Sequence, residues 1–139
     1  MPFDLTLPAT WNILVVDDEP DSIDVVELVF KFQKSRVRTA NSGSECLTLL
    51  NEELADIVFL DIQMPVMSGW DVLKQIRNTP QMQSLVVIAM TAHAMSGDRE
   101  RILGAGFNAY FPKPLSPIAL VSEVRKVIVE ERTKKSPQT

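Results

Sequence analysis

An aspartate stands at the end of an unbroken apolar run in the middle of the chain. Residues 57–60 are all apolar, Asp61 follows them, and Pro65 comes four residues later. Because proline cannot donate to a sheet ladder, this pattern predicts a buried strand that ends at Asp61. A carboxylate at a strand tip can bind cations or act as a nucleophile, but it can also be a turn former or a helix cap. The other strand ends decide between these interpretations.

Three further polar groups end predicted strands or directly follow them. They are Asp17-Asp18 after residues 13–16, Thr91 after residues 85–90, and Lys113 after residues 108–111. Taken singly, each has an ordinary interpretation. The aspartate pair could be a solvated charge cluster, Thr91 a β-branched strand residue, and Lys113 a surface lysine. Their recurrence at successive strand ends favours a common site.

The segments between these strands have the patterns of helices. A first helix is predicted from Pro20 to about residue 34, and a short polar strand around residue 37 follows it. Ser42 with Glu45 and Ser68 with Asp71 form capping-box patterns that begin the next two helices. Two more helices are predicted over residues 96–103 and from residues 116–117 onward, where a serine precedes a proline. Cys46 falls on the apolar face of the second helix, so we expect it to be a core residue.

Five strands alternating with five helices predict parallel βαβ units with right-handed crossovers. The apolar strands need helices on both faces, so the fold class is α/β, with a doubly wound five-stranded parallel sheet. In such sheets the functional site lies beyond the carboxyl ends of the strands, at the switch point in strand order. We therefore expect Asp17, Asp18, Asp61, Thr91 and Lys113 to converge on one edge.

Composition excludes several classes of function. The chain has 139 residues, a net charge of -4 and a pI near 5.0, with no block of basic residues for nucleic acid or an anionic membrane. No apolar run approaches the roughly 20 residues that span a bilayer. The single cysteine, Cys46, cannot form an internal disulfide, and the first eleven residues lack the pattern of a secretory signal. We expect no membrane insertion and a cytoplasmic location.

The chain divides into three parts by composition. Residues 1–11 contain two prolines, and their apolar residues show no helix or strand periodicity, which predicts an N-terminal arm. Residues 12–131 form one domain, and residues 132–139 form a polar C-terminal tail. The tail is too short to be a second domain.

Five motifs in order resemble the receiver domain of two-component response regulators. They are Asp17-Asp18, Asp61 with Met64-Pro65 and Gly69, Met90-Thr91-Ala92, Tyr110-Phe111, and Pro112-Lys113-Pro114. The resemblance covers about residues 12–129. Within the family, the chain resembles a single-domain, chemotaxis-regulator-like receiver. It implies a flavodoxin-like sheet with strand order 2-1-3-4-5.

The resemblance also implies a phosphoryl acceptor. Asp61 would be the phosphorylated residue, and Asp17, Asp18, Asp61 and the backbone carbonyl of Gln63 would hold Mg²⁺. This hard cation favours a few carboxylates, waters and phosphate oxygens. Lys113 would bring a second positive charge to the phosphoryl oxygens and offset repulsion among the carboxylates. Slow self-dephosphorylation is implied, so the chain is not expected to be a dedicated enzyme.

The same resemblance implies a switch and its modulators. Thr91 would bond the phosphoryl oxygen and Tyr110 would then rotate inward, which alters the face made by the fourth helix, fifth strand and fifth helix. The Lys113-Pro114 peptide would be cis. Gln63 and His93 would lie at the mouth of the site and influence the loss of the phosphoryl group.

The implied partners are a histidine kinase or a histidine-containing phosphotransfer protein, and an unidentified downstream target. With no output domain expected, the effect would pass through another protein, or the chain would be a shuttle or sink for phosphoryl groups in a relay. We expect a monomer or a phosphorylation-dependent homodimer.

Two alternatives come from other classes of function. One is a non-phosphorylated interaction module, which would be expected to lose a site residue. The other is a Mg²⁺-dependent phosphatase with an Asp-x-Asp pair. Gln63 occupies the second position of that pair and cannot donate the proton.

Overall fold

The computed structural model describes residues 3–92 and 97–135 and contains one parallel five-stranded sheet. The strands are β1 (Asn12–Val16), β2 (Arg36–Ala40), β3 (Ile57–Asp61), β4 (Val86–Thr91) and β5 (Ala109–Pro112). Their order in the sheet is β2-β1-β3-β4-β5, and every pairing is parallel. The predicted fold class and strand order are confirmed.

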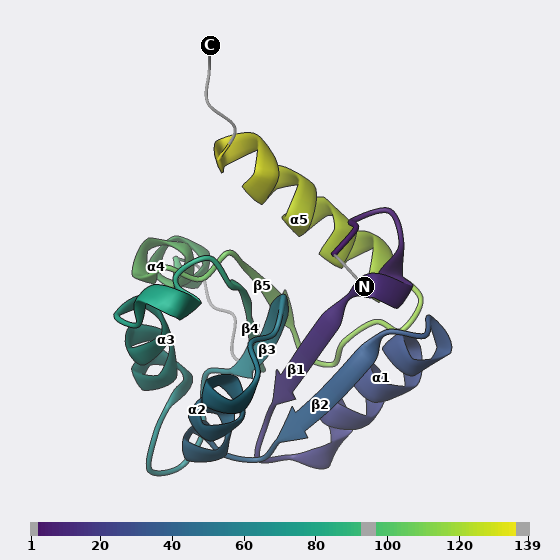
Figure 1. Cartoon of the computed structure of the whole chain (residues 1–139). Helices are drawn as coiled ribbons and strands as arrows, with labels where there is room; N and C mark the ends of the chain where they lie inside the picture. Colours follow the sequence, from purple (N-terminus) through teal and green to yellow (C-terminus); the bar gives the residue numbers. More distant parts are fainter. Residues whose placement is uncertain (1–2, 93–96, 136–139) are drawn as a thin grey trace.

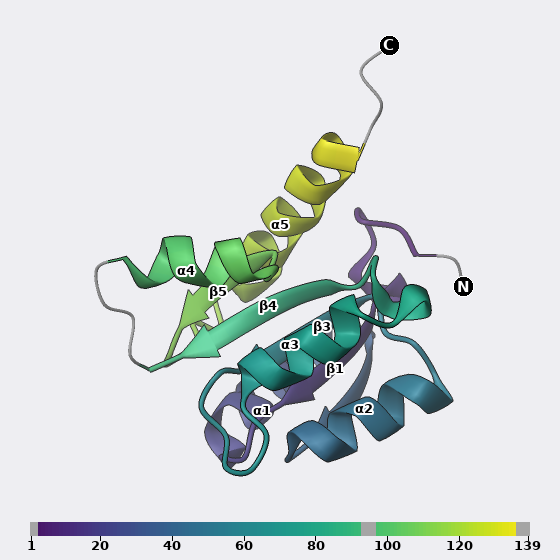
Figure 2. The same cartoon turned by 90° about the vertical axis from the view of Figure 1, so that its left-hand side faces the viewer.

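In the described residues, five α-helices cover the two faces of the sheet (Figures 1 and 2). They are α1 (Pro20–Phe32), α2 (Gly43–Glu52), α3 (Gly69–Arg77), α4 (Asp98–Ala105) and α5 (Leu120–Lys135). Helices α1 and α5 lie on one face, and α2, α3 and α4 lie on the other. Within residues 3–92 and 97–135, none of the helices has the length and apolar character needed to cross a membrane.

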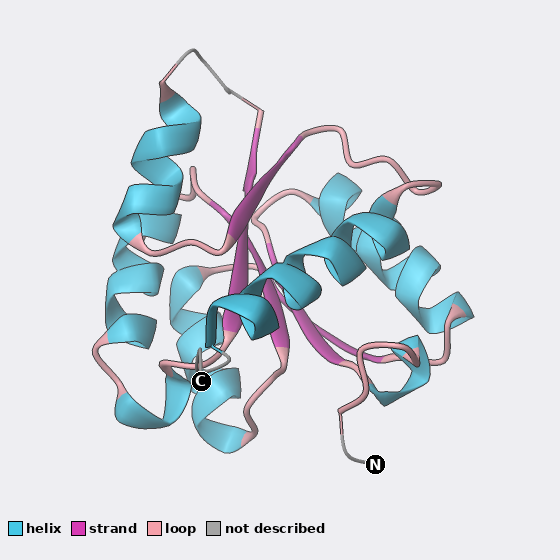
Figure 3. Cartoon of the chain, turned by 90° about the horizontal axis from the view of Figure 1, so that it is seen from above, coloured by secondary structure: helices cyan, strands magenta, loops and turns pink. Residues whose placement is uncertain are grey.

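The core consists of two apolar clusters, one on each side of the sheet. The central strand β3 is buried along its whole length, because helices cover both of its faces (Figure 3). One cluster joins α2, α3 and α4 to the sheet, and the other joins α1 and α5 to it. Cys46 is fully buried in the first cluster, and this burial raises the pKa of its thiol to about 12. The prediction that Cys46 is a core residue is confirmed.

Local signals account for where three helices begin. Pro20 occupies the first turn of α1, where its missing N–H costs nothing. At α3, Ser68 and Asp71 exchange both hydrogen bonds of a capping box. At α2 the Ser42 side chain accepts from the Glu45 N–H, but the Glu45 carboxylate accepts from the Asn41 N–H instead of from Ser42. The predicted box is therefore only half formed there.

Other helix boundaries differ from the sequence prediction. Helix α1 ends at Phe32, because Lys34 adopts a left-handed conformation (φ 68°) and the Ser35 N–H donates to the Phe30 carbonyl. This termination is usually made by glycine, so the sequence carried no signal of it. Helix α4 begins at Asp98, and residue 96, where the prediction started it, lies outside the described residues.

Helix α5 begins later and ends later than predicted. The Ser116 hydroxyl accepts from the Ala119 N–H at 3.3 Å, so it caps a turn over residues 117–119 that precedes the helix. The helix itself runs from Leu120 to Lys135 and includes the first four residues of the predicted polar tail. The remainder of the predicted division into arm, domain and tail stays a prediction.

The N-terminal segment packs against the domain at the amino ends of the strands. Phe3 stacks on the buried ring of Trp11 with 6.3 Å between ring centroids. The guanidinium of Arg132 in α5 lies over the Phe3 ring, 5.4 Å from its centroid. The Trp11 indole N–H donates to the Asp4 carbonyl at 2.9 Å. Sequence periodicity contained no sign of this packing, because the regular structure in the described part of this segment is limited to a short 3-10 turn, η1 (Pro8–Thr10).

Arg77 joins three segments at the same amino edge. Its guanidinium donates to the carbonyls of Gln83, Leu85 and Gly106. It also donates to Oδ1 of Asn108, which in turn accepts from the Val87 N–H. The last residue of α3 thus ties the connections before β4 and β5 together.

Candidate functional site

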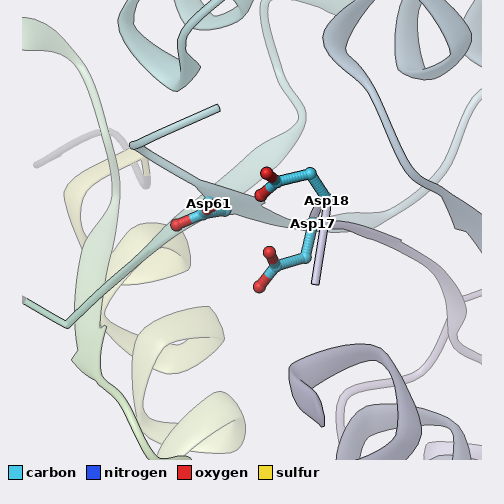
Figure 4. Close-up of side chains that lie close together, drawn as sticks. All are labelled: Asp17, Asp18 and Asp61. Carbon is cyan, nitrogen blue, oxygen red and sulfur yellow. The ribbon is translucent and has the colours of Figure 1, made fainter. Parts of the chain in front are cut away.

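The carboxyl edge of the sheet gathers the side chains that the sequence singled out. Asp61 is the last residue of β3 and Thr91 is the last residue of β4. Asp17 and Lys113 directly follow β1 and β5. Carboxylate oxygens of Asp17, Asp18 and Asp61 lie within 4.8 Å of one another, and Figure 4 shows the three side chains close together at the ends of β1 and β3.

Lys113 supplies positive charge to this cluster. Its ammonium lies 2.7 Å from Oδ2 of Asp17 and 3.3 Å from Oδ1 of Asp61. The Asp17 side chain is fully buried and that of Asp61 is 5% exposed, so both ion pairs are shielded from water. The Lys113-Pro114 peptide is cis, as predicted.

The buried charges shift two pKa values. Burial and the neighbouring Asp17 raise the pKa of Asp61 to about 6, although Lys113 and the Gln63 backbone N–H counteract this rise. Burial lowers the pKa of Lys113, but its hydrogen bond to Asp17 and the charge of Asp61 outweigh burial, so the net direction is upward. The lysine is therefore charged near neutral pH, and the site has more carboxylates than cations.

Gly69 allows α3 to begin directly against the end of β3. A β-carbon at this position would lie 2.4 Å from the Asp61 carbonyl oxygen and 2.7 Å from the α-carbon of Ile62. The Gly69 N–H donates to the Ile62 carbonyl at 2.8 Å, which holds the two segments together. The sequence predicted a tight loop at Gly69. The close approach of Gly69 to the backbone of Asp61 depends on tertiary packing and had no local signal.

The geometry of the acidic cluster fits a hard divalent cation. Three carboxylates converge, and they come from the two adjacent central strands β1 and β3. The Lys113 ammonium is the single polar partner of the buried Oδ2 of Asp17 among the described residues. Three carboxylates against one ammonium leave surplus negative charge, which suits Mg²⁺, a cation that takes a few carboxylates and waters.

The predicted switch residues Thr91 and Tyr110 lie on the neighbouring strands β4 and β5. Thr91 is 5% exposed, and its carbonyl accepts from the Lys113 N–H at 2.8 Å, so β4 and β5 remain paired up to the site. Tyr110 is half-buried and borders a groove of about 580 Å³ between α4, β5 and α5. Gln63 follows Asp61 by two residues and is exposed; its predicted place at the mouth of the site stays a prediction. His93 lies outside the described residues.

Comparison with known proteins identifies the same family along most of the chain. Residues 13–125 match the model of the response regulator receiver domain. The chain is 36% identical over 118 residues to an uncharacterized 14.6 kDa protein from the sodA1 3′ region of Leptolyngbya boryana, covering 85% of this chain and 90% of that protein. It is 34% identical over 117 residues to response regulator SaeR of Staphylococcus aureus, covering 84% of this chain and 50% of SaeR. The chain thus spans about half the length of SaeR.

A solved structure agrees with this assignment. The N-terminal domain of a response regulator receiver protein from Methanoculleus marisnigri has a TM-score of 0.69 and 34% identity, covering 85% of this chain and 96% of that one. With a family match of this extent and the strand order of the sheet, the chain belongs to the family of response regulator receiver domains.

Proposed function

We propose that this chain accepts a phosphoryl group on Asp61 from a phosphohistidine. The observation that carries the proposal is the Lys113 ammonium, which lies 3.3 Å from the carboxylate of Asp61 at the tip of β3. In the step, an Asp61 oxygen forms a bond to phosphorus while the bond from phosphorus to the imidazole nitrogen breaks. The bonding electron pair stays on the imidazole, and the product is an acyl phosphate.

The neighbouring residues supply the electrostatic stabilisation that phosphoryl transfer requires. Lys113 contacts both Asp17 and Asp61, so its ammonium can follow the charge that develops on the phosphoryl oxygens. Asp17, Asp18, Asp61 and the Gln63 carbonyl would hold Mg²⁺, which when bound neutralises the approaching anion. Slow attack of water on phosphorus would release inorganic phosphate and restore the Asp61 carboxylate. Receiver domains are phosphoryl acceptors and not dedicated enzymes.

Thr91 and Tyr110 would transmit the phosphorylated state. The Thr91 hydroxyl would donate to a phosphoryl oxygen, and Tyr110 would turn inward from the groove that it borders. This motion would change the surface formed by α4, β5 and α5. Gln63 and His93 would modulate the rate at which the phosphoryl group is lost.

The proposed donor is a histidine kinase or a histidine-containing phosphotransfer protein in the cytoplasm. It would dock on the start of α1 and on the loop over residues 115–117. The output would be a downstream protein bound at the face of α4, β5 and α5, or a phosphorylation-dependent homodimer. A role as a phosphoryl shuttle or sink in a relay uses the same chemistry and the same residues.

Intact mass spectrometry after incubation with Mg²⁺ and acetyl phosphate tests the proposal. We expect one base-labile phosphoryl adduct on the parent chain and no adduct on Asp61→Asn. Chelation of Mg²⁺ should slow the appearance of the adduct by at least about tenfold, because the surplus carboxylates then repel the donor.

Asp71→Asn is a control outside the acidic cluster, since Asp71 caps α3. This variant should still be phosphorylated. A parent chain that is folded and binds Mg²⁺ but acquires no adduct would contradict the proposal and favour a non-phosphorylated interaction module.

A further inference from the structure

The outward face of α1 carries two large apolar side chains in solvent. Leu28 is 72% exposed and Phe32 is 81% exposed. Phe32 is the one aromatic residue among the large apolar side chains that are exposed in the described part of the chain. The two residues are four positions apart, so they are neighbours on one face of the helix. Val25 is half-buried, precedes Leu28 by three positions and extends this row, which we call the outer stripe of α1.

The core of the domain does not use most of this stripe. Helix α1 packs through its opposite face, where Ser22, Val26 and Phe30 are buried. Of the outer stripe, Val25 packs against the cluster under α1 and α5, whereas Leu28 and Phe32 face away from it. Helix α1 lies beside the edge strand β2 (Figure 1), so the stripe is at the margin of the fold. Adjacent exposed apolar side chains of this size are typical of a surface that another molecule covers.

Charged side chains flank the stripe in a fixed order. The exposed Asp21 and Asp24 precede Leu28, and the exposed Lys31 and Lys34 follow it. Acids at the start of a helix and bases at its end complement the helix dipole, which accounts for the order of the charges but not for the apolar residues between them. The same order makes this face complementary to a copy of itself that runs in the opposite direction.

Helix geometry separates the charged and apolar side chains around Leu28. With about 100° per residue, Asp24 and Lys31 fall on one side of Leu28, and Val25 and Phe32 fall on the other. In each pair, one residue lies three or four positions before Leu28 and the other lies three or four positions after it. A two-fold axis at Leu28 that pairs α1 with an antiparallel copy makes each side face itself. Asp24 then meets Lys31 of the second copy, Val25 meets Phe32, and both contacts occur twice.

We propose that the outer stripe of α1 is the interface of a homodimer in which two copies of α1 pack antiparallel across Leu28. This dimer is independent of the proposed function and uses a different face from the one made by α4, β5 and α5. Helix α1 begins after β1 and ends before β2, so Phe32 lies toward the edge of the sheet opposite Asp61. An interface of one helix per copy is smaller than the roughly 1,200 to 2,000 Å² of stable interfaces. We therefore expect a weak dimer, with a Kd on the order of 10 to 100 µM.

Sedimentation velocity of the full chain, from about 5 to about 500 µM, tests the apolar part of the interface. We expect the parent to change from a monomer of 15.6 kDa to a species of twice that mass as its concentration rises. Leu28→Gln with Phe32→Gln should weaken the dimer by about tenfold or more, because the apolar contacts are lost while glutamine still favours helix. The matched control is Ile118→Gln, at a position that is 98% exposed but outside α1, and it should dimerise like the parent.

Charge reversal tests the antiparallel register. Asp24→Lys and Lys31→Glu each place like charges opposite one another, so each variant alone should dimerise about tenfold or more weakly than the parent. An equimolar mixture of the two should dimerise about as well as the parent. In the mixed dimer the lysine introduced at position 24 meets the glutamate introduced at position 31 of the other copy. Lys31→Glu also removes the ion pair with Glu27 at 2.8 Å, so thermal unfolding of each variant verifies that α1 remains folded.

Four results would overturn the inference. In the first, the parent remains a monomer at the highest concentration. In the second, the variant with glutamine at both stripe positions dimerises like the parent. In the third, the mixture of charge-reversed variants associates no more than its components do. In the fourth, dimers form after treatment with acetyl phosphate and are absent in Asp61→Asn, which would assign the association to phosphorylation. We expect Asp61→Asn to dimerise like the untreated parent.

Discussion

Asp61 differs from an ordinary aspartate in its affinity for a proton. Burial and the nearby Asp17 raise the pKa of Asp61 to about 6, while Lys113 limits the rise. In the absence of metal, the folded chain therefore binds this proton more tightly than the unfolded chain does. The stabilising contribution is complete below the ordinary pKa of an aspartate and is lost as the pH rises through about 6.

Asp61→Asn should remove this dependence. In a chelating buffer, the free energy of unfolding of the variant should exceed that of the parent by on the order of 2 kcal/mol above pH 7, and by much less near pH 4. Urea unfolding at the two pH values measures the difference. Asp24→Asn, at an exposed position outside the cluster, serves as the control. A gain from Asp61→Asn that is the same at both pH values would contradict this account of Asp61.

At the scale of elements, the site depends on the close approach of α3 to β3. Gly69 lies so near the backbone of Asp61 that a β-carbon would meet its carbonyl oxygen at 2.4 Å. Backbone atoms cannot move aside as a flexible side chain can, so α3 or the end of β3 would have to shift. The shift would also displace the carboxylate from Lys113.

Gly69→Ala should therefore lower the free energy of unfolding by roughly 2 to 3 kcal/mol and slow phosphorylation by acetyl phosphate. The matched control is Gly104→Ala in α4, where a β-carbon would meet nothing within 4 Å. This change should raise stability by about 0.5 to 1 kcal/mol, because alanine favours helix. Chemical denaturation measures both variants, and equal effects of the two would refute the role assigned to Gly69.

For the whole molecule, a chain of aromatic rings on one face of the sheet connects the N-terminal segment to the edge strand β5. Phe3, Trp11, Phe30, Phe59 and Phe111 follow one another with 5.9 to 6.3 Å between successive centroids. These rings belong to the cluster under α1 and α5 or pack against it. Because Arg132 also contacts Phe3, the N-terminal segment stabilises the C-terminal half of α5.

Phe3→Ala should lower the free energy of unfolding by about 1 to 2 kcal/mol through lost apolar and aromatic contact. Amide hydrogen exchange in the C-terminal half of α5 should become faster, while the rate of phosphorylation by acetyl phosphate should not change, since Phe3 lies at the edge of the sheet opposite Asp61. Leu7→Ala, in the same segment but 53% exposed, should have a much smaller effect. Unchanged exchange in α5 after Phe3→Ala would show that the segment does not hold this helix.

The sequence by itself determined the strands, the fold class and the edge that contains the site. Short apolar runs with polar ends predict buried parallel strands. This signal is local, so it can be read without knowing which distant segments pack against the strand. Caps such as Ser68 with Asp71 are equally local. The order of the strands and the functional roles came from the resemblance to a family, and of these the order is confirmed by the structure.

Only the tertiary structure decided the features that depend on contacts between distant segments. The ion pairs of Lys113 with Asp17 and Asp61, and the raised pKa of Asp61, require distances that spacing along the chain does not contain. The packing of Phe3 on Trp11 has no periodic signal. Valine rarely adopts a left-handed conformation, so the residue type does not predict the one found at Val66. That conformation depends on tertiary packing, because Met64 and Met67 on either side of it are anchored at the core.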